Sequence, residues 1–300
     1  MSAHEPRAHR RAVALMIVAP LLWSIAGVVT RHLDSAGRWE VTFWRSLFAA
    51  IFVLAALIFT RGAKAWDAVR ATGGYGVLSG AMWAIMFVAF MLALMTTTTA
   101  NTLIVNSIAP LVTALLARAV LKEPIAARTW AAIALAIAGM LWMFGSGFVG
   151  GEPRHLAGML IAFAVPLAAA VNLVTLKHAG RSVDLIPAVL LGAAFSAALT
   201  LPFALPFTAS VHDLLLLALL GCLQLGLPCM LMVRASPHLS APEISLLALL
   251  EVVLGPLWAW LGAGEAPATA TLAGGGLVIV ALLLNELAAF GVRARARRSA

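Results

Sequence analysis

The sequence is poor in charge. Charged residues make up 11% of the 300 residues, whereas soluble domains carry roughly 25%. Hydrophobic residues make up 63% of the chain. Too few polar side chains are present to cover a surface that faces water. The composition therefore excludes an ordinary soluble protein and predicts a chain that folds in a lipid bilayer.

Cysteine and histidine residues are not placed where they could form a disulfide bond, a buried metal site or a catalytic site. The two cysteines, Cys222 and Cys229, are seven residues apart on one expected helix. About 10.5 Å of helical rise would separate them, which is too far for a disulfide bond. No histidine falls in the middle of a long apolar run, so a buried metal site or a histidine-assisted nucleophile is not expected. We therefore expect no catalytic residue, no metal, no cofactor and no enzymatic activity.

Long apolar stretches fill nearly the whole chain. Each has about 20 residues, the length that crosses a bilayer as a helix. No cleavage site for a signal peptide is evident in the first stretch, so we expect it to be retained. The predicted fold class is an all-α integral membrane protein with ten transmembrane helices, and no soluble domain beyond the tails at 1–11 and 290–300. The expected spans, numbered 1 to 10 in chain order, are 12–31, 39–60, 74–94, 99–120, 126–144, 156–176, 185–206, 213–233, 240–261 and 269–289.

The positive residues are distributed unevenly between the two sides of these spans. If the N-terminus is inside, 16 of the 20 lysines and arginines lie on the inside. The positive-inside rule then predicts that both termini are cytoplasmic, in a bacterial cytoplasmic (inner) membrane. The net charge of +8 lies in short flanks without a single basic face, so we read it as a topology signal. Nucleic acid is not an expected partner.

The two halves of the chain repeat each other. With a shift of 142 residues, "TTANTLIVNSIAPLVTALLARAVLKEPIAART" (98–129) aligns with "SAPEISLLALLEVVLGPLWAWLGAGEAPATAT" (240–271), and Glu123 falls on Glu265. With a shift of 146, "PLLWSIAGVVTRHL" (20–33) aligns with "PLAAAVNLVTLKHA" (166–179). Each repeat, 12–144 and 156–289, has five spans. Because five is odd, the second repeat must be inverted in the membrane, which is the structural basis of alternating access in transporters.

This pattern resembles the drug/metabolite transporter superfamily, EamA type. The resemblance covers residues 12–289 and rests on the ten spans, the two five-span repeats, Glu123 and Glu265 after spans 4 and 9, and Arg45 in span 2. Within the family, the chain looks most like the aromatic amino-acid exporters of the YddG type. The resemblance implies a central cavity lined by spans 1, 3, 4, 6, 8 and 9, and an export direction.

Prolines interrupt several spans. A proline inside a helix leaves the carbonyl four residues earlier without its hydrogen bond, and in lipid that carbonyl needs protein, water or ligand. Two of the freed carbonyls belong to Asn106 and Gln224, whose amides make them cavity candidates; the alternative is a kink packed by a neighbouring helix. As gating candidates we take four of these prolines, Pro20, Pro110, Pro166 and Pro228.

Other polar and aromatic residues could also face a cavity. Trp83, Phe87 and Phe90 share one face of span 3, where they form either a ring-lined binding surface or a lipid-facing or core stripe. Trp23 with Ser24 follows the Pro20 kink. Amides inside spans either bind substrate or join helices. The remaining cavity candidates are Asn101, Asn172 and Ser245.

Glu251 stands in the middle of span 9, in "SLLALLEVVLGPLW" (245–258). A carboxylate at that depth costs at least about 2.5 kcal/mol and is by default a functional residue. Three interpretations are open. In order of preference they are a structural or gating hydrogen bond, a coupling-proton site, and an ion pair with Arg45.

Scarce buried charge favours a neutral solute. Together with the resemblance, this predicts an inner-membrane exporter of small metabolites, with aromatic or large neutral amino acids as the preferred solutes, that works by alternating access. The alternative is a multidrug exporter of organic cations, with Glu251 as the counter-ion. Small residues in spans 5 and 10 allow close helix contact, either inside the molecule or in a homodimer, and we favour the monomer. They are Ala132, Ala136, Gly139, Gly274, Gly275 and Gly276.

Overall fold

The computed structural model describes residues 4–121, 127–148, 153–179, 184–239 and 241–298, and every regular element in these ranges is a helix. The first repeat contains α1 (His4–Trp23), α2 (Ala26–Thr30), α3 (Arg38–Arg61), η1 (Gly62–Lys64), α4 (Ala65–Ala71), α5 (Gly73–Leu94), α6 (Thr99–Asn106), α7 (Ala109–Leu121) and α8 (Ala127–Phe148). The second contains α9 (Pro153–Ala162), α10 (Ala164–Ala179), α11 (Ile186–Ala204), α12 (Val211–Leu219), η3 (Leu220–Gly226), α13 (Leu227–Ala235), η4 (Ser236–His238), α14 (Ala241–Ala263) and α15 (Thr269–Arg298).

Seven helical segments in the described ranges are long and apolar enough to cross a membrane. Three shorter apolar helices fall at expected spans 5, 9 and 10, and they are Trp130–Gly139, Leu250–Ala263 and Thr269–Ala281. The chain is thus a multi-pass helical membrane protein, and the number ten stays a prediction.

The helices change geometry near the prolines. Ser107 and Ile108 separate α6 from α7 just before Pro110, and Phe163 separates α9 from α10 before Pro166. The stretch before Pro228 is the π-helix η3. Because proline has no N–H to donate, the preceding turn has no α-helical bond to keep it regular. Near Pro20 the break comes later: α1 ends at Trp23 and α2 begins at Ala26.

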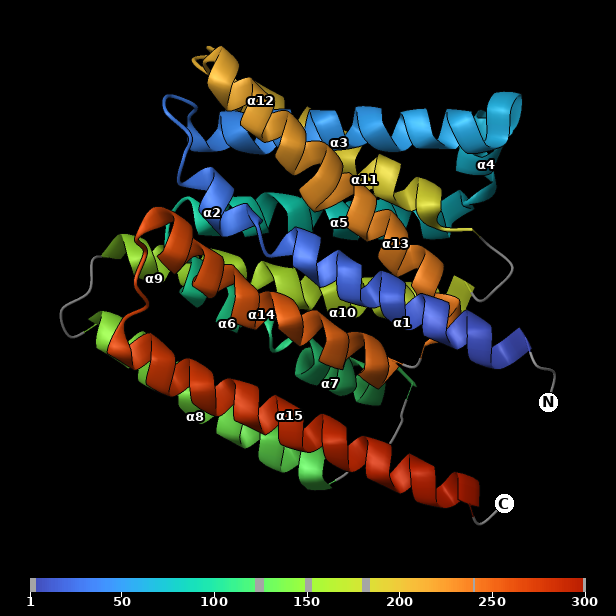
Figure 1. The fold of residues 1–300 in the computed structure, drawn as a ribbon, viewed down its shortest axis with the longest axis vertical. Coiled ribbons are helices and arrows are strands. Elements are labelled where there is room, and N and C mark those ends of the chain that lie inside the picture. Colours follow the sequence, from blue (N-terminus) through green and yellow to red (C-terminus); the bar gives the residue numbers. More distant parts are fainter. Residues whose placement is uncertain (1–3, 122–126, 149–152, 180–183, 240, 299–300) are drawn as a thin grey trace.

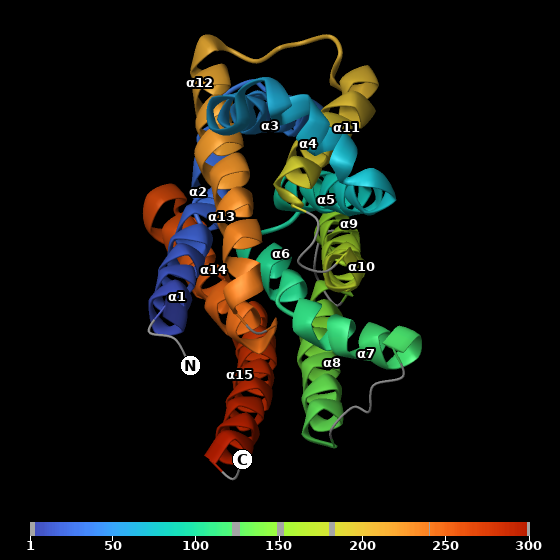
Figure 2. The same ribbon diagram turned by 90° about the vertical axis from the view of Figure 1, so that its right-hand side faces the viewer.

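The helices pack with α3 against α11 at one edge of the molecule and α8 against α15 at the other (Figures 1 and 2). Between these edges, α1 packs on α13 and α14, and α10 packs on α5 and α7. The start of α1 and the end of α15 lie on the same side of the molecule (Figure 1), and we call this side the chain-end face. The turns that follow α2, α5, α11 and α14 lie at the opposite face.

Small residues allow one of these helix pairs, α8 with α15, to approach closely. A Cβ on Gly139 of α8 would lie 2.6 Å from the carbonyl oxygen of Gly274 in α15. Gly276, two residues further along α15 and on the other side of that helix, has open space around it. Spans 5 and 10 therefore use Gly139 and Gly274 for a contact between the two repeats within one chain.

Asp213, in the first turn of α12, organises the turns at the opposite face. Its side chain accepts hydrogen bonds from the backbone N–H groups of Asp34 (2.7 Å), Ser35 (3.0 Å) and Ala36 (3.1 Å). It also completes a capping box with Ser210. One buried carboxylate thus joins the turn between α2 and α3 to the start of α12.

Asp213→Asn is expected to lower the melting temperature of the detergent-solubilised protein by about 4 °C or more. The amide offers one acceptor oxygen in place of two, so backbone N–H groups lose partners at a cost of about 1–3 kcal/mol each. The measurement is thermal unfolding, with Asp67→Asn on the exposed side of α4 as the matched control. Equal melting temperatures for the two variants would show that the carboxylate does not stabilise this face.

Candidate functional site

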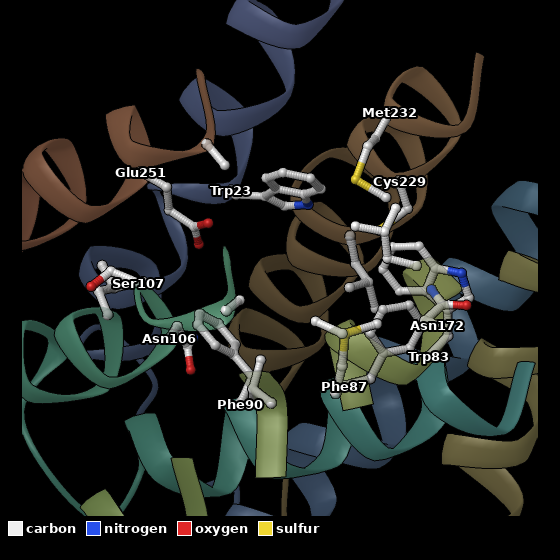
Figure 3. Close-up of a pocket in the computed structure, with 18 of the residues that line it drawn as sticks. Trp23, Trp83, Phe87, Phe90, Asn106, Ser107, Asn172, Cys229, Met232 and Glu251 are labelled. Atoms are coloured by element: carbon white, nitrogen blue, oxygen red, sulfur yellow. The ribbon is translucent and has the colours of Figure 1, made fainter. Parts of the chain in front are cut away.

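A cavity of about 280 Å³ lies among the helices of both repeats. Its walls come from α1, α3, α5, α6, α7, α10, η3, α13 and α14. These elements belong to the six spans that the resemblance implies, together with span 2, which contributes Arg45. Figure 3 shows Glu251 and Trp23 on one side of the space, and Trp83 and Phe87 on another.

The cavity extends toward the chain-end face. In α14 the lining residues run from Ile244 to Val252, the part of the helix nearer that face. In α13 and α10 they reach Met232 and Leu176, near the ends of those helices at the same face. No residue of α2, α9 or α12 lines the cavity. The cavity therefore lies nearer the chain-end face than the opposite face.

Arg45 is the cavity's buried cation. Its side chain is fully buried, and its guanidinium donates to Gln224 Oε1 (3.1 Å) and to the carbonyl oxygen of Phe87 (3.1 Å). The guanidinium also lies over the ring of Phe90, 5.9 Å from its centroid. Its Nε has no hydrogen-bond partner among the described residues. Arg45 thus ties three spans together, and no carboxylate among the described residues forms an ion pair with it.

Glu251 is the cavity's carboxylate. Its side chain is partly exposed to the cavity and is directed into the space near Trp23 and Asn106 (Figure 3). Within the described part of the chain it makes neither a hydrogen bond nor an ion pair, and Arg45 is not within ion-pair distance. The structure therefore shows an acceptor that is open to a ligand on the cavity wall.

Aromatic rings form much of the apolar wall. Trp83 and Phe87 are packed with ring centroids 5.5 Å apart and a tilt of 36°. Trp83 is 5% exposed, yet its indole Nε1 has no hydrogen-bond partner among the described residues. Trp23 and Phe90 complete the rings at the cavity. The face predicted for span 3 is therefore turned inward, toward the cavity.

The structure brings three predicted amides to the cavity, each in a different setting. Both ends of the Gln224 amide are hydrogen-bonded within the protein: its oxygen accepts from Arg45, and its nitrogen donates to the carbonyl oxygen of Trp23 (3.3 Å). Asn172 accepts from Ser79 Oγ (2.7 Å). The Oδ1 of Asn106 is buried and has no partner in the described ranges. Asn106 is therefore the amide with most hydrogen-bonding capacity left for a solute.

Two predicted cavity residues lie elsewhere. Ser24 is buried, donates to the carbonyl oxygen of Leu21 and accepts from Trp258 Nε1 (3.1 Å), so it joins α1 to α14. Asn101 bonds to Thr97 and Thr271 near the opposite face. The prediction that these two residues line the cavity is therefore corrected. Each lies on a turn that faces a neighbouring helix, and its hydroxyl or amide is hydrogen-bonded to that helix.

Pro110, Pro166 and Pro228 follow changes in helix geometry, whereas Pro20 lies inside α1, shortly before its end. Pro20, Pro166 and Pro228 are buried in α1, α10 and α13, and none of them lines the cavity. The side chains of Pro110 and Ser245, and the whole of Glu123, lie outside the described residues.

Several lining residues were missed by the sequence reasoning. Thr113 follows Asn106 and Ala109 at i, i+3 and i+7, so the helical period could have identified it. Met86, Cys229 and Met232 carry no such signal, because apolar residues cover every face of these spans.

Comparison with known proteins agrees with the fold. No curated protein sequence matches the chain. Fifteen solved chains match it, and one, titled "Crystal structure of protein", superposes with a TM-score of 0.66 at 20% identity over 94% of this chain and 98% of its own length. The sequence profile of the EamA-like transporter family matches twice, at residues 10–145 and 156–287. The chain therefore belongs to the EamA-like transporter family and is a membrane transporter of small molecules.

Proposed function

We propose that this protein exports aromatic or large neutral amino acids across a bacterial inner membrane, with both termini in the cytoplasm. The observation that carries this proposal is the composition of the cavity. One buried cation, Arg45, and one carboxylate, Glu251, line it together with four aromatic rings. The two charges sum to zero without touching, so a solute that is itself neutral overall, yet carries both charges, leaves no unbalanced charge inside.

The cavity also has a suitable size and surface. Its 280 Å³ is close to the lower end of small-molecule sites, about 300–1,000 Å³. Rings of Trp23, Trp83, Phe87 and Phe90 favour a solute with an apolar or aromatic side chain. The α-ammonium and α-carboxylate of an amino acid then need the carboxylate of Glu251, the Asn106 amide and the positive field of Arg45.

The helix contacts support alternating access between two inverted five-span repeats. Contacts between the repeats occur in reciprocal pairs, in which exchanging each span for its equivalent in the other repeat turns one contact into the other. The contact of α1 with α14 corresponds in this way to that of α10 with α7, and the contact of α1 with α13 to that of α10 with α5. The contact of α3 with η3 likewise corresponds to that of α11 with α5. Two further contacts join equivalent spans of the two repeats, α3 with α11 and α8 with α15. This pattern is what a two-fold relation between the halves, 12–144 and 156–289, would produce.

The second candidate function is export of organic cations. Glu251 favours it, because a carboxylate that is partly exposed to a cavity lined by aromatic rings suits a cationic solute. Arg45 opposes it, because the cavity would then hold two positive charges against one negative charge.

Counterflow in proteoliposomes tests the proposal. Vesicles preloaded with unlabelled tryptophan, phenylalanine or leucine are expected to accumulate the labelled amino acid, while vesicles preloaded with tetraphenylphosphonium are expected to show no accumulation of that cation. Exchange of the cation without exchange of any amino acid would overturn the proposal and establish the second candidate.

Glu251→Gln is expected to reduce amino-acid counterflow by about tenfold or less. Glutamine keeps a carbonyl that accepts from an ammonium group, and the loss is the difference between a charged and a neutral acceptor. For an organic cation the same change removes the only counter-ion described at the cavity and should abolish transport. Initial rates with both solutes measure this, and a complete loss of amino-acid counterflow in well-folded protein would contradict the assigned role.

A further inference from the structure

A polar cluster around Arg31 and Glu265 lies at the face opposite the chain ends. Arg31, after α2, lies with its Nε 2.6 Å from Glu265 Oε2, and its two terminal nitrogens donate to the carbonyl oxygens of Leu94 (2.9 Å) and Thr97 (3.0 Å). Glu265 also accepts from the backbone N–H and the hydroxyl of Thr99. Every one of these bonds joins segments that are far apart in the sequence.

The cluster connects the parts that would have to separate for the cavity to open at this face. Arg31 ends span 1, Leu94 ends α5, Thr99 begins α6, and Glu265 lies between α14 and α15. The helices α1, α5, α6 and α14 all line the cavity, and their lining residues stop short of the cluster. The bonds of Glu265 to Arg31 and Thr99 therefore cross from the second repeat to the first.

The cluster is stable in this arrangement, because both of its charged groups have hydrogen-bond partners. The guanidinium of Arg31 has three acceptors, and the carboxylate of Glu265 has donors on both oxygens. Charge-assisted hydrogen bonds of this kind are about twice as strong as neutral ones. Opening the opposite face would break several of them at once.

We propose that Arg31, Thr99 and Glu265 form a latch that keeps the transporter closed at the face opposite the chain ends while the cavity is accessible from the chain-end face. Release of this latch is a required step of transport, and Arg31 and Glu265 set the ratio of the two states. This inference rests on the proposed alternating access, and it concerns neither the solute nor the cavity residues.

Thiol labelling measures the state of the latch without any solute. A single-cysteine protein is made with Cys222→Ser, Cys229→Ser and Ala248→Cys, because Ala248 lines the cavity one turn from Glu251. A membrane-impermeant methanethiosulfonate reagent is applied to sealed vesicles of each orientation. Labelling is expected to be fast from the chain-end face and slow from the opposite face. Glu265→Gln and Arg31→Gln should each raise the rate from the opposite face by about tenfold or more.

The controls separate the latch from general loosening. Asp184→Asn breaks a matched ion pair, that of Asp184 with Arg61 at the chain-end face, and should leave labelling from the opposite face unchanged. The double variant Arg31→Gln/Glu265→Gln should label no faster than the quicker single variant, because both residues belong to one latch. An unchanged rate in both single variants that elute as monodisperse protein, or an equal rise in Asp184→Asn, would overturn the latch. Failure of amino-acid counterflow would overturn the transport proposal and leave the labelling result standing.

Discussion

Arg45→Met is expected to reduce counterflow by at least about 100-fold. Methionine matches the length of the arginine stem, yet removes the donors that Gln224 Oε1 and the carbonyl oxygen of Phe87 now use. Gln224 Oε1 is then a buried acceptor without a donor, which costs about 1–3 kcal/mol, and about 1.4 kcal/mol corresponds to a factor of ten. The variant also leaves the charge of Glu251 unbalanced. Initial counterflow rates in proteoliposomes at equal protein density measure the loss.

Arg70→Met provides the matched control. Arg70 also lies over an aromatic ring, that of Trp66 at 5.6 Å, yet it is exposed on α4 and does not line the cavity. Its replacement should leave the rate within about twofold of wild type, because exposed substitutions change stability by less than about 0.5 kcal/mol. Arg45→Lys keeps the charge and loses the forked geometry, so an intermediate rate is expected. Wild-type transport by Arg45→Met would remove Arg45 from the proposed site.

Gly221→Val is expected to lower the melting temperature by about 5 °C or more and to reduce transport with it. A Cβ at this position would lie 2.6 Å from the carbonyl oxygen of Arg45, 2.6 Å from Phe48 Cβ and 2.9 Å from the backbone nitrogen of Ala49. These atoms belong to α3 backbone or to its first side-chain carbon, so rotation of a side chain cannot relieve the overlap. Overpacking of this kind costs about 1–3 kcal/mol or more.

The same substitution at Gly276 tests whether added bulk alone is responsible. No atom lies within 4 Å of a Cβ built at Gly276, so Gly276→Val should keep the wild-type melting temperature within about 1 °C. Thermal unfolding of both variants in the same detergent gives the comparison. Equal melting temperatures for Gly221→Val and Gly276→Val would show that η3 can move away from α3 without loss of stability. The close approach at Gly221 would then not be what holds Gln224 beside Arg45.

Much of the fold could be predicted because its signals are local. An apolar run of about 20 residues is a property of its own segment, and so is the place where a proline weakens a helix. The breaks before Pro110 and Pro166 follow from this. The duplication is a property of the chain compared with itself, and the family profile that matches twice agrees with it. The inverted arrangement and the cytoplasmic termini remain proposals.

The candidate site was predictable where a polar or aromatic residue stood out on a single helix. Trp23, Trp83, Phe87, Asn106, Asn172, Gln224 and Glu251 all line the cavity, whereas Ser24 and Asn101 do not. Ser24 and Asn101 are polar residues in the spans like several of the others, and what distinguishes them is a partner on another helix, Trp258 in one case and Thr271 in the other. A single helix contains no information about such a partner.

The sequence by itself thus determined that the chain folds in a lipid bilayer, that it is helical and that it contains a duplication. It also identified the few charged and amide residues inside the spans. Only the tertiary structure decided that Arg45 meets Gln224 and Phe87, that Glu251 stands open at the cavity, and that Glu265 meets Arg31 and Thr99 at the opposite face. The physical reason is that in lipid every face of a span is apolar, so hydropathy does not orient a helix about its axis. Orientation follows from close packing at glycines such as Gly221 and from polar pairs between helices.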